Sequence, residues 1–360
     1  CKLPLPWSGG CHGFNETVIL QIAHAFVKTG LKDAGYEYVN LDCGYSTGFR
    51  QPNGTLTVNA TRYPHGMHWL GDQIHNLGLK FGMYSDAGPT QCCSRIFGPK
   101  ANDGSLQHET VDAELFASWG VDYLKHDNCG SEKSSYPSMR DALNKTGRPI
   151  YYSVHGPTDV GSVANCWRTT PDINNTWASI VERAIMNDQH ASSAAPGAFN
   201  DPDMLEVGNL FGALGDNEGR SHFSMWAVMK APLLIGTDVT NMTQATLQTL
   251  TNTDVVSINQ DKLGIQAKML SHQPSVDDPS FTFAGPLTAG ETVALIVNNR
   301  PSPQDLHLLL ADVVPEDQAT YHVQDLWKHS SVGTFHTQDK LSFPAVAGHD
   351  CVLVRISAPQ

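Results

Sequence analysis

Acidic side chains recur at the ends of short apolar segments of this sequence. The clearest case is residues 121–129, where an apolar run leads into Lys125, His126 and Asp127. Four other segments make the same transition, and they end at Asp42, Asp86, Asp172 and Asp203. In a chain of alternating strands and helices, the carboxyl ends of the strands open into the cleft where ligands bind. We therefore expect these carboxylates to gather in one cleft, although any single one could simply cap the next helix.

Two carboxylates with a lysine and an arginine nearby can cleave a glycosidic bond. One carboxylate attacks or stabilises the anomeric carbon, and the other protonates the leaving oxygen. Lys125 and Asp127 share one predicted strand, and Arg168 and Asp172 share another segment. The Asn-Asp-Pro-Asp stretch at 200–203 is denser in carboxylate and could equally supply the acid. The residue types alone therefore leave the identity of the acid open.

Apolar runs and helical stripes alternate over the first two thirds of the chain. A helix is expected from Glu16 to Thr29, because apolar side chains recur there with helical spacing and Gly30 follows. Further helices are expected at about 69–77, 108–119, 137–146, 177–190 and 220–230. Strands are expected at about 3–7, 36–42, 80–86, 121–129, 150–155, 166–172, 199–203 and 233–238. These near-continuous apolar runs are typical of parallel strands buried on both faces.

After residue 261 the pattern changes to short strands without helices between them. Strands are expected at 280–284, 292–297, 307–310 and 351–356, with a hairpin-like turn at 286–290. Such a series predicts a separate antiparallel domain. We therefore expect an α/β protein, in which a catalytic (β/α)8 TIM barrel in residues 1–265 is followed by an antiparallel β-sandwich domain in residues 266–360. We expect no chemistry in the second domain.

Charge and composition narrow the range of partners. The chain of 360 residues has 23 lysines and arginines against 36 acids, a net charge of −13, and no basic run. This balance disfavours nucleic acid and anionic membranes as partners. No apolar run approaches the roughly 20 residues that cross a bilayer. An oligosaccharide or polysaccharide substrate fits better, and the sequence carries no signal of an oligomeric state.

Cysteine and asparagine usage indicates the secretory route. Eight cysteines accompany glycosylation acceptor motifs at Asn15, Asn53, Asn59, Asn144, Asn174 and Asn241. The chain starts at Cys1 without an apolar leader, so we take it as a mature form that is secreted or held in the lumen of a vacuole or lysosome. The cysteine spacing, with Cys92 next to Cys93, matches no zinc pattern. We expect neither a metal nor a cofactor.

Five motifs, in order along the chain, resemble glycoside hydrolase family 27, which contains α-galactosidases and α-N-acetylgalactosaminidases. They are residues 84–88, 124–129, 166–172, 200–205 and 230–235. The resemblance covers nearly the whole chain, including the C-terminal β-domain. It implies a retaining glycosidase that removes a terminal α-D-galactosyl-type residue, with Asp127 as the nucleophile and Asp172 as the acid/base. The two carboxyl groups of such an enzyme stand about 5–5.5 Å apart.

The same resemblance implies contacts to the sugar. Lys125 would touch the sugar hydroxyls, and Arg168 would hold the 2-hydroxyl. Trp7 would form an apolar wall under the pyranose ring, although ordinary packing in the barrel explains a tryptophan there equally well. The expected substrate-binding residues are Trp7, Asp42, Cys43, Tyr84, Lys125, His155, Arg168 and Asp203.

The resemblance also implies a disulfide between Cys93 and Cys129, which would tie together the loops after the third and fourth strands. A second disulfide between Cys11 and Cys43 is plausible. Four cysteines remain without an assigned partner, and they are Cys1, Cys92, Cys166 and Cys351.

Three positions depart from the family pattern, and all lie in the part that is expected to bind the sugar. Leu-Asp-Cys-Gly-Tyr at 41–45 places Cys43 where the family has the second of two acids that grip the 4- and 6-hydroxyls. Val-His-Gly-Pro at 154–157 lacks the usual bulky wall beside the 2-substituent, and His126 stands where tyrosine is common. Loss of one charged acceptor costs about 1.5–3 kcal/mol of recognition unless another group replaces it.

These departures do not affect the residues expected to carry out the reaction, but they leave the identity of the sugar undecided. An α-galactoside is the leading substrate. The alternatives are a β-L-arabinopyranoside, which needs no contact to a 6-hydroxyl, an isomaltose-type α-glucan and an α-N-acetylgalactosaminide. A catalytically inactive carbohydrate-binding protein is a further alternative, but the presence of both carboxylates and both basic residues of the motifs argues against it.

Overall fold

The computed structural model describes residues 14–129, 135–156, 161–209, 214–270, 275–315 and 320–358. The chain forms two compact units, one of Cys1–Arg168 with Asp238–Asn241 and one of Thr169–Thr237 with Met242–Gln360. The division falls inside the segment that was expected to form one barrel. The domain boundary expected at residue 265 therefore stays a prediction.

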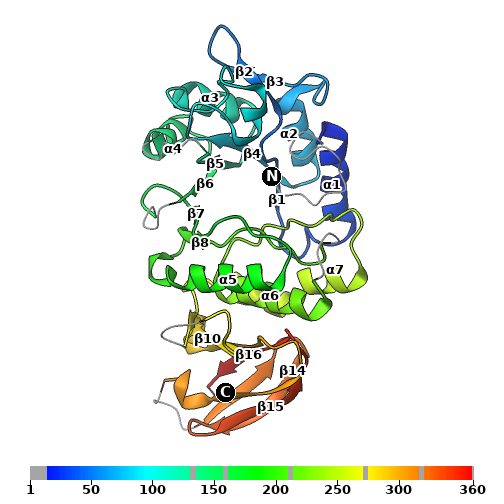
Figure 1. Ribbon diagram of the computed structural model, residues 1–360, viewed down its shortest axis with the longest axis vertical. Helices are drawn as coiled ribbons and strands as arrows, with labels where there is room; N and C mark the ends of the chain where they lie inside the picture. The colour runs from blue at the N-terminus through cyan, green and yellow to red at the C-terminus, as the bar shows by residue number, and fades with distance from the viewer. Residues whose placement is uncertain are drawn as a thin grey trace. The chain divides into compact units, whose positions relative to one another are not determined.

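The first unit alternates parallel strands with helices, as the sequence predicts (Figure 1). Its strands lie in the order β1 (Tyr38–Asn40), β4 (Lys80–Asp86), β5 (Tyr123–Asp127), β6 (Tyr151–His155) and β7 (Cys166–Arg168). Its helices are α1 (Glu16–Lys28), α2 (Gly66–Asn76), α3 (Glu109–Ser118) and α4 (Tyr136–Lys145). Parallel neighbours need such crossover connections, so this half of the βα fold is confirmed.

The register of the central strands brings polar strand ends to one level. Asp86 is the partner of Asp127 across β4 and β5, and Tyr84 is the partner of Lys125. All residues of β4 after Lys80 are buried. The strand therefore carries its apolar side chains into the core and delivers its acidic end to the edge where ligands bind.

A two-stranded hairpin lies between the strand expected at 36–42 and the helix expected at 69–77, where no strand was predicted. It consists of β2 (Ser46–Arg50) and β3 (Leu56–Val58), and it is followed further along the chain by the 3-10 helix η2 (Cys92–Phe97). Arg50 anchors the hairpin, because its guanidinium lies 2.7 Å from the buried carboxylate of Asp112 on α3. The hairpin strands are short and polar, so they lack the apolar pattern from which strands are predicted.

The second unit begins with the rest of the βα segment. Its strand and helices are β8 (Phe199–Asp201), α5 (Trp177–Asp188), α6 (Asp216–Val228), α7 (Gln244–Leu250) and α8 (Thr253–Asn259). The strand expected at 233–238 is reduced to a parallel bridge between Leu205 and Ile235. Pro232 just before it lacks an amide donor, which limits the ladder. The strand expected at 3–7 lies outside the described residues.

Helix α6 begins one turn earlier than expected, and α7 and α8 were not expected. Both short helices start at side-chain caps, which are Thr243 for α7 and Asn252 for α8. Such caps satisfy amide groups that a helix leaves unpaired at its start. Seven residues are too few to show a helical stripe clearly, so the apolar pattern missed both.

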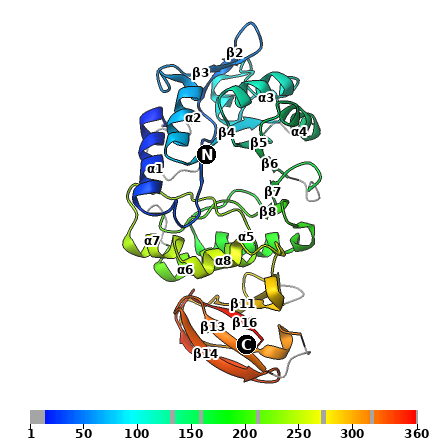
Figure 2. The same ribbon diagram turned by 180° about the vertical axis from the view of Figure 1, so that it is seen from behind.

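The C-terminal part of the second unit consists of antiparallel strands (Figure 2). The strands are β9 (Lys268–Met269), β10 (Ser280–Pro286), β11 (Thr292–Asn298), β12 (Gln304–Leu309), β13 (Thr320–Asp325), β14 (Ser330–His336), β15 (Lys340–Val346) and β16 (Cys351–Ser357). One sheet has the order β14-β13-β16-β11-β10-β9, and the other pairs β12 with β15. Apolar side chains of both sheets, such as Ile296 and Leu308, form one core. The predicted antiparallel domain is confirmed.

Helix α6 and the C-terminal sheet are joined by polar contacts within the second unit. Arg220 on α6 lies 2.7 Å from the carboxylate of Asp350, and the indole of Trp327 donates to Ser224 at 2.9 Å. All seven residues of β11 are buried. The strand is covered on both faces, which explains why it reads as an uninterrupted apolar run.

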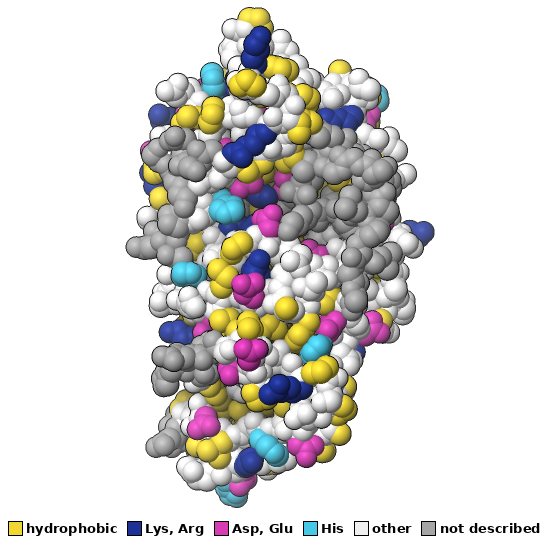
Figure 3. Space-filling view, viewed as in Figure 1, with side chains coloured by type: hydrophobic (Ala, Val, Ile, Leu, Met, Phe, Trp, Pro, Cys, Tyr) yellow, Lys and Arg dark blue, Asp and Glu magenta, His cyan; other side chains and the backbone are white. Residues whose placement is uncertain are grey.

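The surface carries mixed charge on the face shown in Figure 3. Lysine and arginine side chains are scattered there among acidic and polar ones, without a broad basic area. Among the helices that the structure describes, none has the apolar length to cross a bilayer.

Candidate active site

The carboxylate of Asp127 lies at the end of β5 and is held by several donors. Its Oδ1 lies 3.0 Å from Nδ1 of His155 and accepts the backbone N–H of Asn128 at 2.9 Å. Its Oδ2 accepts the hydroxyl of Tyr84 at 3.0 Å and lies 3.7 Å from Nζ of Lys125. Both oxygens are therefore engaged, while the side chain keeps 14% of its surface exposed.

Lys125 is shared between two carboxylates. Its ammonium donates to Oδ2 of Asp42 at 2.7 Å, which is closer than its approach to Asp127. The backbone N–H of Cys43 donates to the other oxygen of Asp42 at 2.7 Å. The same ammonium lies 5.2 Å from the centre of the Tyr84 ring. Lys125 and Asp42 thus form an ion pair beside the Asp127 carboxylate.

Electrostatics keep these groups charged. Burial alone would raise the pKa of the Asp127 carboxyl, but the hydrogen bond from His155 and the charge of Lys125 lower that pKa well below its usual value. Burial also opposes the ionised form of Asp42, yet the charge of Lys125 lowers the pKa of this carboxyl too. Burial disfavours the charged form of Lys125, but Asp42 and Asp127 together raise the pKa of the amine. The cluster is therefore a stable set of ions.

Two disulfides join three strand ends, and both pairings expected from the sequence are wrong. The structure pairs Cys43 with Cys93 and Cys92 with Cys129. Cys92 and Cys93 begin the 3-10 helix η2, where consecutive side chains point about 120° apart. Adjacent half-cystines can therefore reach different loops. Cys11 lies outside the described residues, and Cys43 is already bonded to Cys93.

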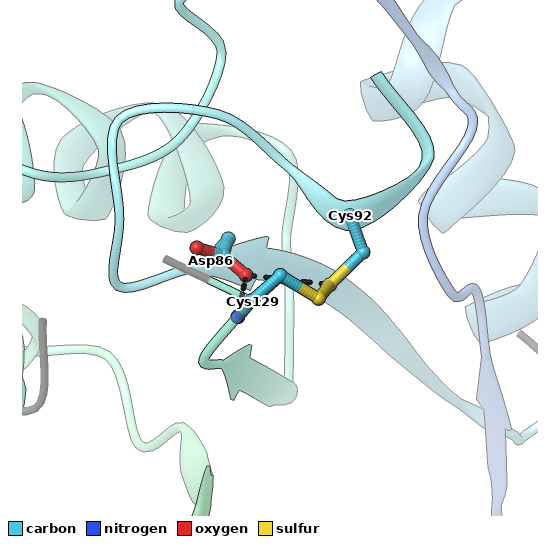
Figure 4. Close-up of side chains that lie close together, drawn as sticks. All are labelled: Asp86, Cys92 and Cys129. Atoms are coloured by element: carbon cyan, nitrogen blue, oxygen red, sulfur yellow. Dashed lines mark hydrogen bonds between the residues drawn. A yellow bond between two sulfur atoms is a disulfide. The ribbon is translucent and has the colours of Figure 1, made fainter. Parts of the chain in front are cut away.

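The Cys92–Cys129 disulfide lies against the acidic end of β4 (Figure 4). Oδ2 of Asp86 accepts the backbone N–H of Cys129 at 2.8 Å, and its Oδ1 accepts the N–H of Gly88 at 2.7 Å. Burial raises the pKa of Asp86 in spite of these bonds. The side chains of Asp86, Cys92 and Cys129 are close enough together to suggest a metal site. The sulfurs are bonded to each other, however, so they are not thiolate ligands.

The sulfur of Cys92 also lies near the Asp127 carboxylate. It is 3.5 Å from Oδ2 of Asp127 and 2.9 Å from the hydroxyl oxygen of Tyr84. Asp86 was expected in the cleft without a specific role, and Cys92 was left without a partner. One feature of the sequence could have indicated the position of Cys92. Two adjacent cysteines follow β4, and a loop with two half-cystines can be bonded to both neighbouring strand ends.

The carboxylates of the second unit have different surroundings. Asp172 is exposed, and its backbone carbonyl accepts a bond from the guanidinium of Arg183 on α5 at 2.8 Å. Asp203 is buried, and its Oδ2 accepts the backbone N–H of Ile173 at 2.7 Å. Its Oδ1 accepts its neighbour's N–H, that of Met204, at 2.8 Å. Asp203 thus fixes the backbone just after Asp172, which suits a supporting part better than direct chemistry.

Most of the expected sugar-binding residues of the first unit lie in the cluster around Asp127. Tyr84 is buried and bonded to Asp127, and Cys43 is buried within a disulfide. Arg168 is buried on β7 and is the register partner of His155. Trp7 lies outside the described residues. The expected separation between the Asp127 and Asp172 carboxyl groups stays a prediction.

Comparisons with known proteins point to one family. A family model described as alpha galactosidase A matches residues 10–261, and a model of the alpha galactosidase C-terminal beta sandwich domain matches residues 277–356. Alpha-galactosidase 3 of Arabidopsis thaliana is 42% identical over 360 residues, which cover 96% of this chain and 78% of that protein. An alpha-galactosidase of Coffea arabica is 43% identical over 341 residues, covering 91% of this chain and 87% of the relative.

A solved structure has the same fold. The crystal structure of alpha-galactosidase I from Mortierella vinacea superposes with a TM-score of 0.86 at 31% identity, covering 98% of this chain and 96% of that one. The similarity extends over both the βα part and the C-terminal β-domain. The expected fold class, a (β/α)8 barrel followed by an antiparallel β-sandwich, is therefore confirmed.

Proposed function

Because the chain belongs to the alpha-galactosidase family of glycoside hydrolases, we propose that it removes terminal α-D-galactosyl residues from oligosaccharides or polysaccharides with retention of configuration. The observation that carries this proposal is the carboxylate of Asp127 at the end of β5, which has donors at both oxygens and the ammonium of Lys125 beside it. A nucleophile must be charged and aimed before substrate arrives, and these contacts supply both conditions.

The reaction follows two displacements. Protonated Asp172 gives its proton to the glycosidic oxygen while a carboxylate oxygen of Asp127 bonds to the anomeric carbon and the bond to the leaving group breaks. Asp172, now ionised, then takes a proton from water as the water oxygen attacks the anomeric carbon and releases Asp127. Asp172 is exposed, as a group that meets both leaving group and water must be. Asp203 holds the backbone that follows it.

We propose that the remaining site residues bind the sugar. Lys125 and Asp42 lie beside Asp127 and offer a donor and an acceptor to sugar hydroxyls. Arg168 on β7 and Trp7 would complete the site, as the family resemblance implies. The chemistry then belongs to residues 1–265, and the β-domain in residues 266–360 takes no part in it. The reaction needs no metal or cofactor.

A β-L-arabinopyranoside is the second candidate substrate, and one observation favours it. Cys43, which stands where the family has a second acid, is buried in a disulfide with Cys93. Its sulfur cannot grip a 6-hydroxyl as a carboxylate does, and a pentopyranose has no such hydroxyl. The family alternatives with α-N-acetylgalactosamine or an isomaltose-type glucan have no comparable support.

A panel of nitrophenyl glycosides tests the substrate directly. The α-galactoside is expected to give the highest kcat/KM, ahead of the β-L-arabinopyranoside, the α-N-acetylgalactosaminide and the α-glucoside. A higher value for the arabinopyranoside would select the second candidate. Absence of turnover on all four would favour the inactive carbohydrate-binding protein.

We further propose that the protein is made in the secretory pathway and works outside the cell or in a vacuole or lysosome. Both disulfides require an oxidising compartment. Four acceptor asparagines are exposed, namely Asn53, Asn144, Asn174 and Asn241, whereas Asn15 and Asn59 are partly buried. Asn15 also caps α1 through its side chain. Glycan mapping is therefore expected to find sugar first at the four exposed positions.

A further inference from the structure

A histidine from β6 bonds the carboxylate of Asp127. Nδ1 of His155 lies 3.0 Å from Oδ1, and the His155 side chain keeps 35% of its surface exposed. From the sequence, His155 was expected to bind the sugar. The contact instead commits one ring nitrogen to the nucleophile.

The backbone of His155 is fixed, so its ring is aimed from a rigid frame. The hydroxyl of Tyr136 on α4 donates to the carbonyl of His155 at 2.5 Å. Strand β6 also pairs with β5 on one side and with β7 on the other. These backbone contacts fix the direction in which the side chain leaves the strand towards Asp127.

In the contacts described above, the other side chains around His155 and Asp127 do not duplicate the contact of His155 to Oδ1. The charged and titratable groups of the first unit near His155 and Asp127 lie on five elements, and they are Asp42 after β1, Tyr84 and Asp86 on β4, Lys125 and His126 on β5, Tyr136 on α4 and Arg168 on β7. Lys125 is paired with Asp42 and reaches Asp127 only at 3.7 Å. Burial and the charge of Asp127 raise the pKa of Tyr84 well above its usual value, so Tyr84 stays neutral.

We propose that His155 is a positioning residue for the nucleophile, which fixes Oδ1 of Asp127 and keeps that carboxylate ionised. The inference rests on the proposed function in so far as Asp127 is the nucleophile. Without His155, Oδ1 keeps only the backbone N–H of Asn128 as a donor from the contacts described above. Because the hydrogen bond from His155 helps to lower the pKa of Asp127, the variant carboxyl takes up a proton at higher pH.

Three variants distinguish the positioning role of His155 from a purely structural role. In His155→Asn the amide nitrogen replaces Nδ1 and keeps a donor, whereas His155→Ala removes it. The exposed His68, changed to Asn, serves as a matched control. His155→Ala is expected to lose roughly 10- to 100-fold in kcat/KM, mainly in kcat, since a hydrogen bond to a charged group is lost. His155→Asn should stay within about fivefold of the wild type, and added imidazole should restore part of the activity of His155→Ala.

A second measurement needs no substrate. Carbodiimide modifies protonated carboxyl groups, so peptide mapping after treatment at pH 5 reports the proton on Asp127. Faster labelling of Asp127 in His155→Ala than in the wild type, with His155→Asn close to the wild type, is the expected result. Equal labelling of Asp127 in the wild type and His155→Ala would overturn the inference.

The two measurements distinguish a failure of the proposed function from a failure of the inference on His155. A wild type without activity on α-galactosides refutes the proposed function, while the labelling still decides the part of His155. A fully active His155→Ala variant refutes the inference alone. If His155→Ala does not fold, His155→Gln replaces it, because a glutamine amide lies near Nε2 rather than Nδ1. His155→Gln should then label like a variant without the bond, and labelling equal to that of His155→Asn contradicts the proposal.

Discussion

The surroundings of Asp127 and of Asp172 differ in the way that their proposed parts require. Asp127 keeps only 14% of its side chain exposed, and both of its oxygens accept hydrogen bonds beside the ammonium of Lys125. Asp172 is exposed, and the bonds described around it hold its backbone, through Arg183 and Asp203. The first side chain is largely enclosed by its donors, whereas the second is open to solvent.

The tasks that we propose for the two carboxylates are opposite. Donors and cations around a carboxyl group favour its charged form, and a nucleophile needs that form. An acid/base must take up a proton and give it away in turn, so it cannot be held as firmly in one state. Substitutions that remove a charge from each region should therefore have unequal effects.

The largest effect is expected from Asp127→Asn, which removes the nucleophile. Turnover should fall on the order of 10⁴-fold or more on every substrate, because the proposed mechanism forms its covalent intermediate on this carboxylate. Asp172→Asn should lose about 10²–10⁴-fold on poor leaving groups. It should retain a slow reaction with dinitrophenyl substrates, which need no proton. Steady-state kinetics on a leaving-group series measure both variants.

Azide sharpens the same comparison. It should raise the activity of Asp172→Asn by attacking the glycosyl-enzyme without base assistance, and it should leave the anomeric configuration of the product unchanged. Rescue of Asp127→Asn with retention would exchange the two assignments, whereas rescue with inversion is expected of a nucleophile variant, in which azide attacks the anomeric carbon directly.

The disulfides mark a second difference, since they tie the region around Asp127 and none is described near Asp172. They close loops with sequence separations of 50 and 37 residues, so either loss should lower the free energy of unfolding by about 2–4 kcal/mol. The sulfur of Cys92 lies 3.5 Å from the Asp127 carboxylate, and Cys129 follows Asp127 by two residues. Replacing this pair by serines should therefore also reduce kcat.

The pair Cys43 and Cys93 provides the matched control for that prediction. Its replacement by serines should cost similar stability with a smaller change in kcat. Denaturant melts and kinetics on both double variants make the comparison. Equal kcat losses would mean that the Cys92–Cys129 disulfide has no special part at the nucleophile.

Each unit also buries a neutral histidine, and this gives a prediction on pH. Burial lowers the pKa of His126, next to the nucleophile, to about 4. It lowers that of His222 on α6 to about 3. The unfolded chain binds a proton at each site below about pH 6.5, whereas the folded chain does not. Stability is therefore full above pH 6.5 and is lost as the pH falls towards 4.

The size of the loss can be tested with single variants. Between pH 7 and pH 5, His126 is expected to lower the free energy of unfolding by about 2 kcal/mol. Thermal melts from pH 7 to pH 4 should show a smaller fall for His126→Gln and for His222→Gln than for the wild type. The same slope for all three proteins would show that other groups control the acid sensitivity.

The smallest effect is expected from Asp203→Asn in the second region. Asparagine keeps the shape of the side chain but weakens the bond to the Ile173 N–H, because the acceptor loses its charge. The difference is about 1 kcal/mol, or roughly fivefold in kcat. Asp305→Asn is the control, since this exposed carboxylate also accepts a backbone N–H, that of Ala345, in the β-domain. A loss in kcat for Asp203→Asn no greater than for the control would remove Asp203 from the support of Asp172.

The sequence predicted the elements with strong apolar patterns well. Strand β4 has the predicted bounds, and α1 ends within one residue of the prediction. The hairpin of β2 and β3 and the short helices α7 and α8 were missed, because polar contacts and caps hold them rather than an apolar stripe. Periodicity needs a regular series of apolar side chains, and these elements are too short or too polar to show one.

The site was predicted in part for a similar reason. Lys125, Asp127 and Asp42 stand at strand ends, and parallel register brings such ends to one level. The disulfide pairing could not be read in the same way, because the direction of Cys92 and Cys93 depends on the turn of η2 and not on their order. The bond from His155 to Asp127 likewise depends on a side-chain orientation that spacing does not contain.

The stereochemistry of the product tests the central claim most directly. Proton NMR can follow the anomeric signal of the first-formed sugar from an aryl α-galactoside before mutarotation. Direct attack by Asp127 predicts that the α-anomer appears first, since two displacements restore the configuration. First appearance of the β-anomer would mean that Asp127 activates a water molecule instead and forms no covalent intermediate.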